Sequence, residues 1–326
     1  MNADALTQFI ASEIEPHAQR WEKDRLVPNE TFEKAGQAGL CGLMVPIEDG
    51  GYNLPLGELV TVFEKLAYSD MGFAFALIPH NNLANAIARE ATGPVKNRYL
   101  EAMLAGELLG AFLLTEPGVG SDASRITTRA ELTGNRWLLN GEKSWVTNGS
   151  RAGLLRVYAQ TEPGSGASGI AAFLVDADQA GVTSSQPYDM LGGYAIGVGA
   201  VSFSQVELHE GQLLSPPGVA YAAAMGAIGL ARVLVAALCV GILQRALEVC
   251  VERLDQRHAF GERLADKQGL RWMLADVATD LKAARALTHI AADAIDSNQA
   301  DSIVQAAHAK KFAARAATKG VEQCMQ

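Results

Sequence analysis

The chain has 326 residues and a net charge of −9, and 49% of its residues are hydrophobic and 19% charged. This length allows one large core or two to three smaller domains, and the composition is that of a globular enzyme. The negative charge argues against nucleic-acid binding, which needs clustered lysine and arginine. The four cysteines, Cys41, Cys239, Cys250 and Cys324, form neither a CxxC motif nor a zinc-like cluster, so we expect reduced thiols and no metal.

The sequence gives no indication of secretion or membrane insertion. The N-terminal segment lacks a basic stretch followed by an apolar one. The most apolar stretch, 221–241, contains Arg232, and a central arginine is costly in lipid, so we expect a buried helix. These features predict a cytoplasmic, bacterial protein.

Residues 1–108 are predicted to form a helical domain. Leu6, Phe9, Ile10 and Ile14 recur at helical spacing. Asn29 is expected to cap a short helix that runs to about residue 39. Further helical patterns cover residues 56–68, 71–90 and 94–105.

Residues 109–214 are predicted to form a β-domain, a small barrel or sandwich. Gly134-Asn135 between two β-prone runs indicates a hairpin turn. The GxGxxG pattern at 164–169 has a strand on both sides, so we interpret it as a hairpin loop instead of a dinucleotide site. The predicted strands are 110–115, 127–132, 136–140, 153–160, 170–175 and 200–208.

Residues 215–326 are predicted to form a helical bundle. One very long helix runs to about residue 257, a second follows Asp266 with an apolar stripe, and a third begins near Asp301. No stop signal ends the third helix before Gln326, so we expect a chain cut inside a helix. The predicted fold class is therefore α+β, mostly α.

Two stretches of the β-domain have the residues of a binding site. Leu114–Asp122 offers hydroxyls, exposed amides and glycines that allow a ligand to approach the main chain, although any tight loop could have these residues. Residues 141–149 contain Trp145 and Thr147, predicted to lie on one strand face. A core tryptophan and an indole placed against a flat cofactor are both compatible with this pattern.

A third stretch, Arg257–Gly261 with Gln268 eleven residues after Arg257, is a weak pattern alone. Together the three stretches resemble the TEPxxGSD, W-x-T and RxxFG…Q motifs of the acyl-CoA dehydrogenase family. The resemblance runs from about residue 5 to 326. It implies that family's fold, with an N-terminal helical domain, a middle β-domain and a C-terminal helical bundle.

The resemblance also implies FAD as the cofactor and an acyl-CoA thioester as the substrate. Arg257, Phe260 and Gln268 would reach the FAD of a neighbouring subunit, which implies an obligate homo-oligomer, a dimer of dimers. The CoA portion would contact Ser121 and Arg232. The residues expected to contact FAD are Phe112, Leu114, Thr115, Gly120, Ser121, Trp145, Thr147, Arg257, Phe260, Gln268 and Gln326.

The implied reaction is α,β-dehydrogenation to the 2-enoyl-CoA, with hydride transfer to flavin N5, in fatty acid or amino acid catabolism. An electron-transfer flavoprotein is the implied electron acceptor. The reaction needs a carboxylate to take the α-proton. Family members place this Glu beyond a GGxG turn that lies outside these residues, or one residue before Arg232, where this chain has Ala231. No Asp or Glu occurs between Glu210 and Glu248, so we assign no catalytic residue and expect the Glu beyond residue 326.

Two alternatives share the fold: a non-catalytic flavin-binding or assembly protein, and an acyl-CoA oxidase. Phe112 stands where the family commonly has Tyr, and the loop 191–194 lacks an Arg often found there. Glu116 and Asp122 are expected to fix the loop by accepting backbone N–H bonds instead of serving as the base. His80 is interpreted either as a polar pocket wall or as a helix cap or solvated residue.

Overall fold

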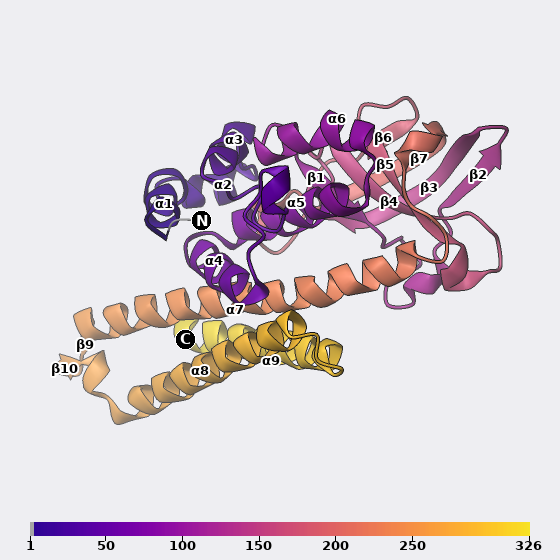
Figure 1. Ribbon diagram of the computed structural model, residues 1–326. Helices are drawn as coiled ribbons and strands as arrows, with labels where there is room; N and C mark the ends of the chain where they lie inside the picture. Colours follow the sequence, from indigo (N-terminus) through magenta and orange to yellow (C-terminus); the bar gives the residue numbers. More distant parts are fainter. Residues whose placement is uncertain (1–2) are drawn as a thin grey trace. The chain divides into compact units, whose positions relative to one another are not determined.

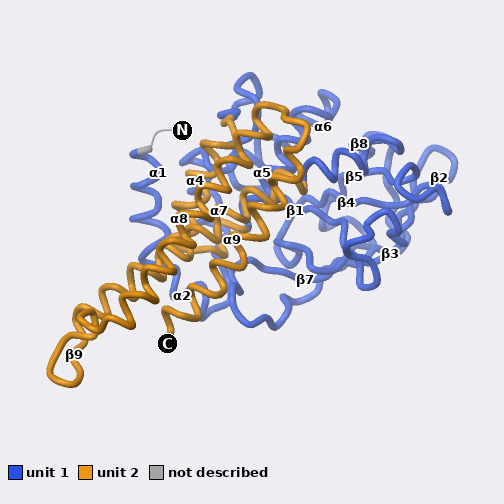
Figure 2. The backbone as a smooth tube through the Cα atoms, turned by 90° about the horizontal axis from the view of Figure 1, so that it is seen from below, with its two compact units in different colours: residues 1–53, 76–227 blue, residues 54–75, 228–326 orange. Residues whose placement is uncertain are grey.

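The computed structural model describes residues 3–326 and divides into two compact units (Figure 2). Unit 1 comprises residues up to 53 and 76–227, and unit 2 comprises residues 54–75 and 228–326. Helices predominate, and unit 1 contains one eight-stranded sheet (Figure 1). The predicted fold class is confirmed.

The helices of the first hundred residues lie close to their predicted positions, within one residue for the last three. Asn29 is the first helical residue of its helix and not the cap, because the preceding Pro28 holds the extended conformation of the cap position. A short π-helical turn covers Ile10–Ile14. The α-helices are α1 Ala3–Phe9, α2 Ala18–Asp24, α3 Asn29–Gln37, α4 Leu56–Ser69, α5 Met71–Glu90 and α6 Gly93–Leu104.

The sheet contains all six predicted strands and two short ones, β6 and β8. Its order is β6-β7-β3-β2-β4-β5-β8, and β1 pairs in parallel with β4. The strands are β1 Gly110–Leu113, β2 Arg129–Thr133, β3 Arg136–Val146, β4 Leu154–Gln160, β5 Ile170–Asp176, β6 Val182–Ser184, β7 Gly199–His209 and β8 Leu213–Ser215.

Two predicted loops of the β-domain are confirmed. Gly134 has a φ of +64° and Thr133 pairs with Arg136, so Gly134-Asn135 is the two-residue turn of the β2–β3 hairpin. The GxGxxG segment forms a 3₁₀ turn, Gly166–Gly169, between the antiparallel strands β4 and β5. No helix follows it, so it lacks the helix N-terminus that a pyrophosphate site requires.

Strand β4 is buried along its whole length because both of its faces are covered. Leu155 and Val157 belong to a core cluster shared with Leu139 and Phe203 from the other half of the sheet, so the sheet folds around this core. On the opposite face, Leu154 packs in a second cluster with residues of α5 and α6. This arrangement explains why β4 lacks hydrophobic alternation.

Unit 2 contains α4, most of the long helix α7, and the helices α8 and α9. The helix α7 spans Ala220–Gln256, α8 spans Gln268–Asp296 and α9 spans Ser302–Met325, and the short strands β9 His258–Ala259 and β10 Glu262–Arg263 join α7 to α8. The three predicted helices are confirmed. Of the expected apolar stripe on α8, however, only Val277 and Leu281 are buried, whereas Leu270, Met273 and Leu274 are half-buried.

Helix α7 is long and apolar enough to cross a membrane by length and composition. Its segment 233–240 is nevertheless packed inside the protein, with Val233, Leu234 and Leu238 at most 2% exposed. A Cβ at Gly241 would lie 2.3 Å from the backbone oxygen of Glu64, so glycine allows α4 and α7 to approach closely. The helix is therefore a core helix, as the arginine argument predicted.

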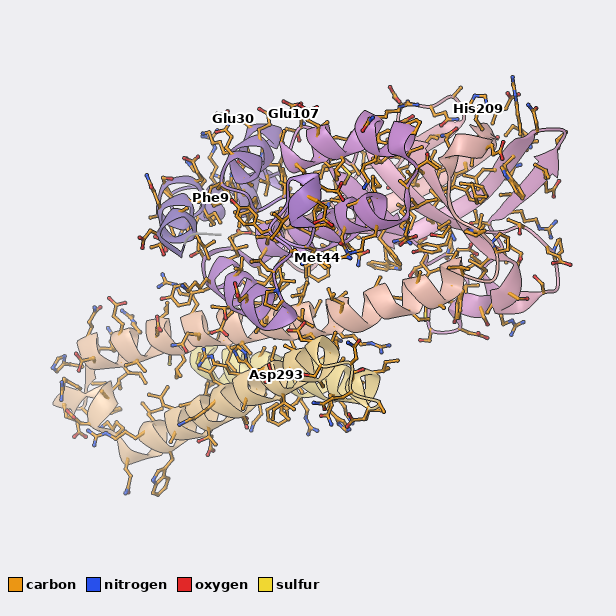
Figure 3. All side chains as sticks on the ribbon, in the orientation of Figure 1. Phe9, Glu30, Met44, Glu107, His209 and Asp293 are labelled. Carbon is orange, nitrogen blue, oxygen red and sulfur yellow. The ribbon has the colours of Figure 1, made fainter. Side chains whose placement is uncertain are left out.

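Charged and apolar side chains separate as expected for a folded globular chain. Figure 3 labels Glu30 and Glu107, which are exposed, and Met44, which is buried. In unit 2, Arg285 on α8 donates to Glu64 on α4 at 2.7 and 3.0 Å, and Asp296 accepts the backbone N–H of Leu56 at 3.0 Å. Polar contacts thus join α4 to α8 at two separate points along the helices.

Candidate functional site

A buried ion pair organises the loop that follows β1. Lys143 on β3 lies 2.8 Å from Glu116, and both side chains are at most 2% exposed. Lys143 Nζ also donates to the Leu114 carbonyl at 3.0 Å. Glu116 accepts the backbone N–H groups of Thr127 and Thr128 at 2.7 and 2.9 Å. The expectation that Glu116 fixes the loop is confirmed. Asp122 accepts the Ser124 hydroxyl and, within residues 3–326, no backbone N–H, so the same expectation for Asp122 was wrong.

The electrostatics of this pair agree with a structural role. Burial alone would raise the pKa of Glu116, but Lys143 and the loop hydrogen bonds outweigh it and lower that pKa to about 2. Burial lowers the pKa of Lys143 to about 8, against the opposing effect of Glu116. A carboxylate held ionised in this way is a poor proton acceptor, so Glu116 is unsuited to act as a general base.

Trp145 is presented to solvent by an unusual backbone conformation. It has a φ of +58°, and the β3–β7 register shifts between Lys143 and Val146. Its side chain is 64% exposed and stacks edge-on against Tyr188 at 5.0 Å. The expected alternation does not hold here, because the bulge breaks it and Thr147 lies just beyond the end of β3.

The two predicted stretches of the β-domain lie side by side. Ser144 N–H donates to the Thr115 carbonyl at 2.9 Å, which places the start of the loop next to the residue that precedes Trp145. Thr115 and Thr147 are half-buried. The structure therefore brings Thr115, Trp145 and Thr147 into one region of unit 1.

The other predicted residues of unit 1 differ in exposure. Phe112 on β1 is half-buried and packs on the Tyr158 ring at 5.0 Å, and Leu114 is buried. Gly120 and Ser121 are exposed, and a Cβ added at Gly120 would meet no atom within 4 Å. An exposed indole beside hydroxyl groups and an open glycine loop fits a flat aromatic cofactor with polar edges.

Arg257, Phe260 and Gln268 lie at or beside the β9–β10 hairpin, at one end of the helices of unit 2 (Figure 1). Phe260 is 95% exposed with a φ of +56°, and Lys267 Nζ lies 5.4 Å from its ring centroid. The Arg257 guanidinium is exposed and has no hydrogen bond or ion pair with any residue from 3 to 326. The hairpin thus presents a phenyl ring and an uncommitted cation to solvent.

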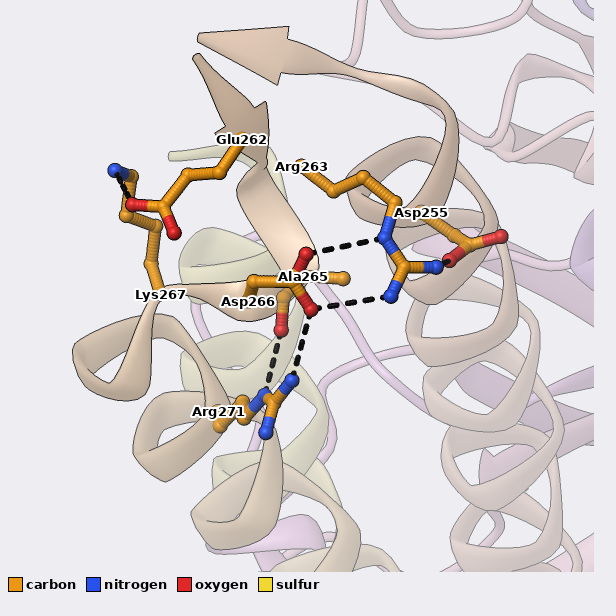
Figure 4. A network of polar contacts seen from close by, with 7 residues as sticks. All are labelled: Asp255, Glu262, Arg263, Ala265, Asp266, Lys267 and Arg271. Carbon is orange, nitrogen blue, oxygen red and sulfur yellow. Dashed lines mark hydrogen bonds and ion pairs between the residues drawn. The ribbon is translucent and has the colours of Figure 1, made fainter. Parts of the chain in front are cut away.

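An ion-pair network supports this hairpin (Figure 4). Arg263 binds Asp266 with two contacts of 3.1 Å and Asp255 with one of 2.7 Å. Arg271 donates to Asp266 at 3.0 Å, and Lys267 pairs with Glu262. Arg263 and Arg271 are engaged in this network, whereas the Arg257 side chain takes no part in it.

The two remaining predicted residues lie elsewhere in unit 2. Arg232 is half-buried on α7, directly after the half-buried Ala231, and Gln326 is the exposed last residue beyond α9. No group of three or more His, Cys, Asp or Glu side chains suitable for a metal occurs within residues 3–326.

Sequence reasoning missed a buried polar pair that holds the start of β1. His80 Nδ1 accepts the Gly110 N–H at 3.2 Å, and Asn148 Nδ2 donates to the carbonyls of Ala76 and Gly110 at 2.9 and 3.2 Å. His80 is fully buried, and burial lowers its pKa to about 4, so the interpretation as a solvated residue was wrong. Only the position of Asn148, directly after Thr147, could have drawn attention to it.

Comparison with known proteins agrees with this geometry. Residues 1–107, 111–206 and 221–326 match the N-terminal, middle and C-terminal domain models of acyl-CoA dehydrogenases. The chain is 33% identical over 319 residues to an acyl-CoA dehydrogenase of Bacillus subtilis, and 32% identical over 320 residues to a 3-(aryl)acrylate reductase of Clostridium sporogenes. Each alignment covers 98% of this chain and 84% of the relative.

Solved structures are similar to this chain over nearly its whole length. Butyryl-CoA dehydrogenase from Megasphaera elsdenii superimposes with a TM-score of 0.93 at 29% identity, over 99% of this chain and 85% of that one. An FAD complex of PigA superimposes with a TM-score of 0.92 at 25% identity, over 99% and 86%. The chain belongs to the acyl-CoA dehydrogenase family, and FAD is its cofactor.

Proposed function

We propose that this protein dehydrogenates an acyl-CoA thioester at its α,β bond to give the 2-enoyl-CoA. The observation that carries the proposal is the exposed indole of Trp145 beside the half-buried Thr115 and Thr147, within a chain whose relatives include acyl-CoA dehydrogenases. Bound FAD supplies the hydride acceptor for this reaction. The chain's own residues bind and orient the reactants.

We assign different parts of the cofactor to different residues of unit 1. The Trp145 ring provides a flat face, and Thr115 and Thr147 offer hydroxyl hydrogen bonds to the edge of an aromatic cofactor. The open loop at Gly120 and Ser121 offers backbone amides and a hydroxyl to phosphate groups. Phe112, on β1, and Leu114, just after β1, supply the apolar side of the proposed cofactor site.

In unit 2, the proposed contacts are cationic or amide groups. The unpaired Arg257 suits a pyrophosphate, since a guanidinium can bind phosphate oxygens in a bidentate fashion. Phe260, Gln268 and Gln326 complete the proposed cofactor contacts, and Arg232 is assigned to the CoA portion. We further propose that Arg257, Phe260 and Gln268 serve the FAD of a second copy, in a dimer of dimers.

The α-proton must go to a carboxylate, and we assign none of residues 1–326 as that base. Ala231 occupies one of the two family positions for it, and the sequence has no Asp or Glu between Glu210 and Glu248. An electron-transfer flavoprotein is the proposed acceptor of the electrons, and fatty acid or amino acid catabolism the proposed setting.

Reduction of an α,β-unsaturated acid derivative is a second candidate, because two relatives are named as reductases. One is the 3-(aryl)acrylate reductase, and the other is the acryloyl-CoA reductase (NADH) of Anaerotignum propionicum, which is 34% identical over 287 residues. The oxidase alternative differs from both in its reaction with oxygen. Rapid reoxidation of the reduced protein by air would favour the oxidase.

The proposal is tested by comparing two tryptophans with equal exposure. Trp145 and Trp272 are both 64% exposed, but Trp272, on α8, is not among the proposed cofactor contacts. We expect Trp145→Ala to lower the FAD content of the purified protein at least severalfold and to shift the flavin absorption, whereas Trp272→Ala leaves both unchanged. Unchanged FAD content and spectrum in Trp145→Ala would refute the assignment.

A further inference from the structure

Cys250 on α7 and Cys324 on α9 form a thiol pair inside unit 2. Besides burial, Cys250 raises the pKa of the Cys324 thiol, so the two side chains are neighbours. Both thiols are free, and both side chains are partly exposed to solvent. The sequence does not reveal this pair, because 73 residues separate the two cysteines.

The packing of α7 against α9 supports this pairing. A Cβ at Gly320 would lie 2.4 Å from Leu243 Cδ1, so the α9 backbone rests directly on that buried leucine. Because α8 reverses the chain direction between them, α7 and α9 run in the same direction (Figure 1). From this contact, Cys250 lies about 10 Å further along α7 and Cys324 about 6 Å further along α9.

Another pair of neighbours lies earlier along both helices. The charge of Lys310 on α9 acts on the thiol of Cys239 on α7. Lys310, Gly320 and Cys324 therefore follow one another along α9 in the order in which their neighbours Cys239, Leu243 and Cys250 follow along α7. The thiol pair thus belongs to faces of α7 and α9 that are neighbours at more than one point.

We propose that Cys250 and Cys324 are a redox-active dithiol that closes to an intrachain disulfide and locks the end of α9 to α7. The oxidant is a small-molecule disulfide. The Cys250 thiolate attacks it, forms a mixed disulfide and releases one small thiol; Cys324 then loses its proton, attacks the Cys250 sulfur and releases the second. Two protein thiols are oxidised, and one small disulfide is reduced to two thiols.

The environments of the four cysteines make this reaction selective. Burial, together with Cys250, raises the pKa of Cys324 to about 11, so Cys324 keeps its proton at neutral pH and suits the second, resolving step. Burial raises the pKa of Cys41 to about 12 and makes its thiol inaccessible to reagents. Burial also raises the pKa of Cys239, so we expect both of these thiols to react slowly.

The disulfide would close a long loop that contains the β9–β10 hairpin and α8. Closing such a loop restricts the unfolded chain and stabilises the folded one. The bond would also hold the last turn of α9, which ends one residue after Cys324. None of these consequences depends on bound flavin.

The test uses the full chain and oxidised glutathione at mildly alkaline pH. We expect the native protein and the control Cys239→Ser to lose two hydrogen atoms by intact mass, to yield a peptide linking Cys250 to Cys324, and to gain several degrees in Tm that dithiothreitol reverses. Cys250→Ser and Cys324→Ser should form no link and show no such gain.

Three results would overturn the proposal. One is a native chain that keeps glutathione on Cys250 without forming the link. The others are a link between two chains on a non-reducing gel, and a link that includes Cys239. The thermal measurement on the native chain gives a second readout if a serine variant fails to fold.

Discussion

At the scale of single residues, Trp145 owes its exposure to its backbone. A left-handed conformation is uncommon for a bulky residue, and such outliers gather at functional sites. The ring of Tyr188, from the segment between β6 and β7, then supports the indole from the side at 5.0 Å. Neither feature is visible in the W-x-T pattern, although the pattern identified the residue.

Tyr188 is therefore expected to act as a positioning residue for Trp145. An edge-on aromatic pair contributes about 0.5–1.5 kcal/mol beyond simple burial, which corresponds to roughly twofold to tenfold in affinity. We expect Tyr188→Ala to weaken FAD binding within this range, and Tyr188→Phe to restore it because the ring remains. Titration of the apoprotein with FAD, followed by tryptophan quenching, measures the effect; equal affinities for both variants would exclude this role.

The ion pair of Glu116 and Lys143 predicts a pH-dependent stability. Glu116→Gln leaves Lys143 buried without its partner, so we expect a loss of about 3–5 kcal/mol in the free energy of unfolding at pH 7. The pKa of Glu116 is depressed from 4.5 to about 2 in the folded protein, so its contribution is complete above pH 4.5. That contribution is lost as the pH falls toward 2, and the difference between native protein and variant narrows.

Urea denaturation at a series of pH values measures this difference. Glu131→Gln is the control, because Glu131 lies exposed on β2 and forms no ion pair within residues 3–326. A gap between native protein and Glu116→Gln that stays constant from pH 7 to pH 3 would contradict the account.

At the scale of elements, β3 depends on a glycine at its irregular segment. Gly141 has a φ of +144°, and a Cβ there would lie 2.6 Å from Thr128 Oγ1 and 2.7 Å from Thr128 Cα. We expect Gly141→Ala to lower stability by about 2–4 kcal/mol, because it adds backbone strain and a clash with the main chain. Gly93→Ala is the control, since a Cβ at Gly93 meets no atom within 4 Å. Thermal unfolding of the two variants with equal Tm would contradict this reading of β3.

The elements that the sequence predicted well have strong local signals. Helices α4, α5 and α6 follow apolar periodicity, and Gly134-Asn135 specifies its turn by local chemistry. Strands β6 and β8 were missed because each has only three residues and pairs at an edge of the sheet. The α8 stripe was overestimated because periodicity shows which face is apolar, but not how much of that face the neighbouring helices cover.

The β9–β10 hairpin, which joins α7 to α8, is proposed to bind the FAD of a second copy, and this can be tested at Arg257. Arg257→Ala is expected to weaken FAD retention by tenfold or more, since a charged hydrogen bond contributes about 1.5–3 kcal/mol. Arg253→Ala is the control, an exposed arginine one turn earlier on α7. Gel filtration with absorbance at the flavin wavelength reports oligomer and cofactor together; full retention of FAD by Arg257→Ala in an unchanged oligomer would argue against a contact across subunits.

At the scale of the whole molecule, the sequence predicted the family, the cofactor and the fold class, because three motifs far apart in the chain fit one family. It could not predict contacts that only tertiary structure creates. The support of Trp145 by Tyr188, the buried pairing of His80 with Gly110, and the meeting of Cys250 and Cys324 all join segments at least 30 residues apart. The domain boundaries at 108 and 214 and the individual cofactor contacts stay predictions.

The proposed cofactor site and the assignment of no base are tested together by the visible absorption spectrum of the purified chain. The chain is saturated with FAD, freed of excess cofactor, and measured before and after anaerobic addition of acyl-CoA. We expect a stable flavin band that dithionite bleaches and that short and long acyl-CoA leave unbleached, because we assign no residue from 1 to 326 as the base. Bleaching by an acyl-CoA would contradict that assignment. A chain that retains no flavin would contradict the proposed site itself.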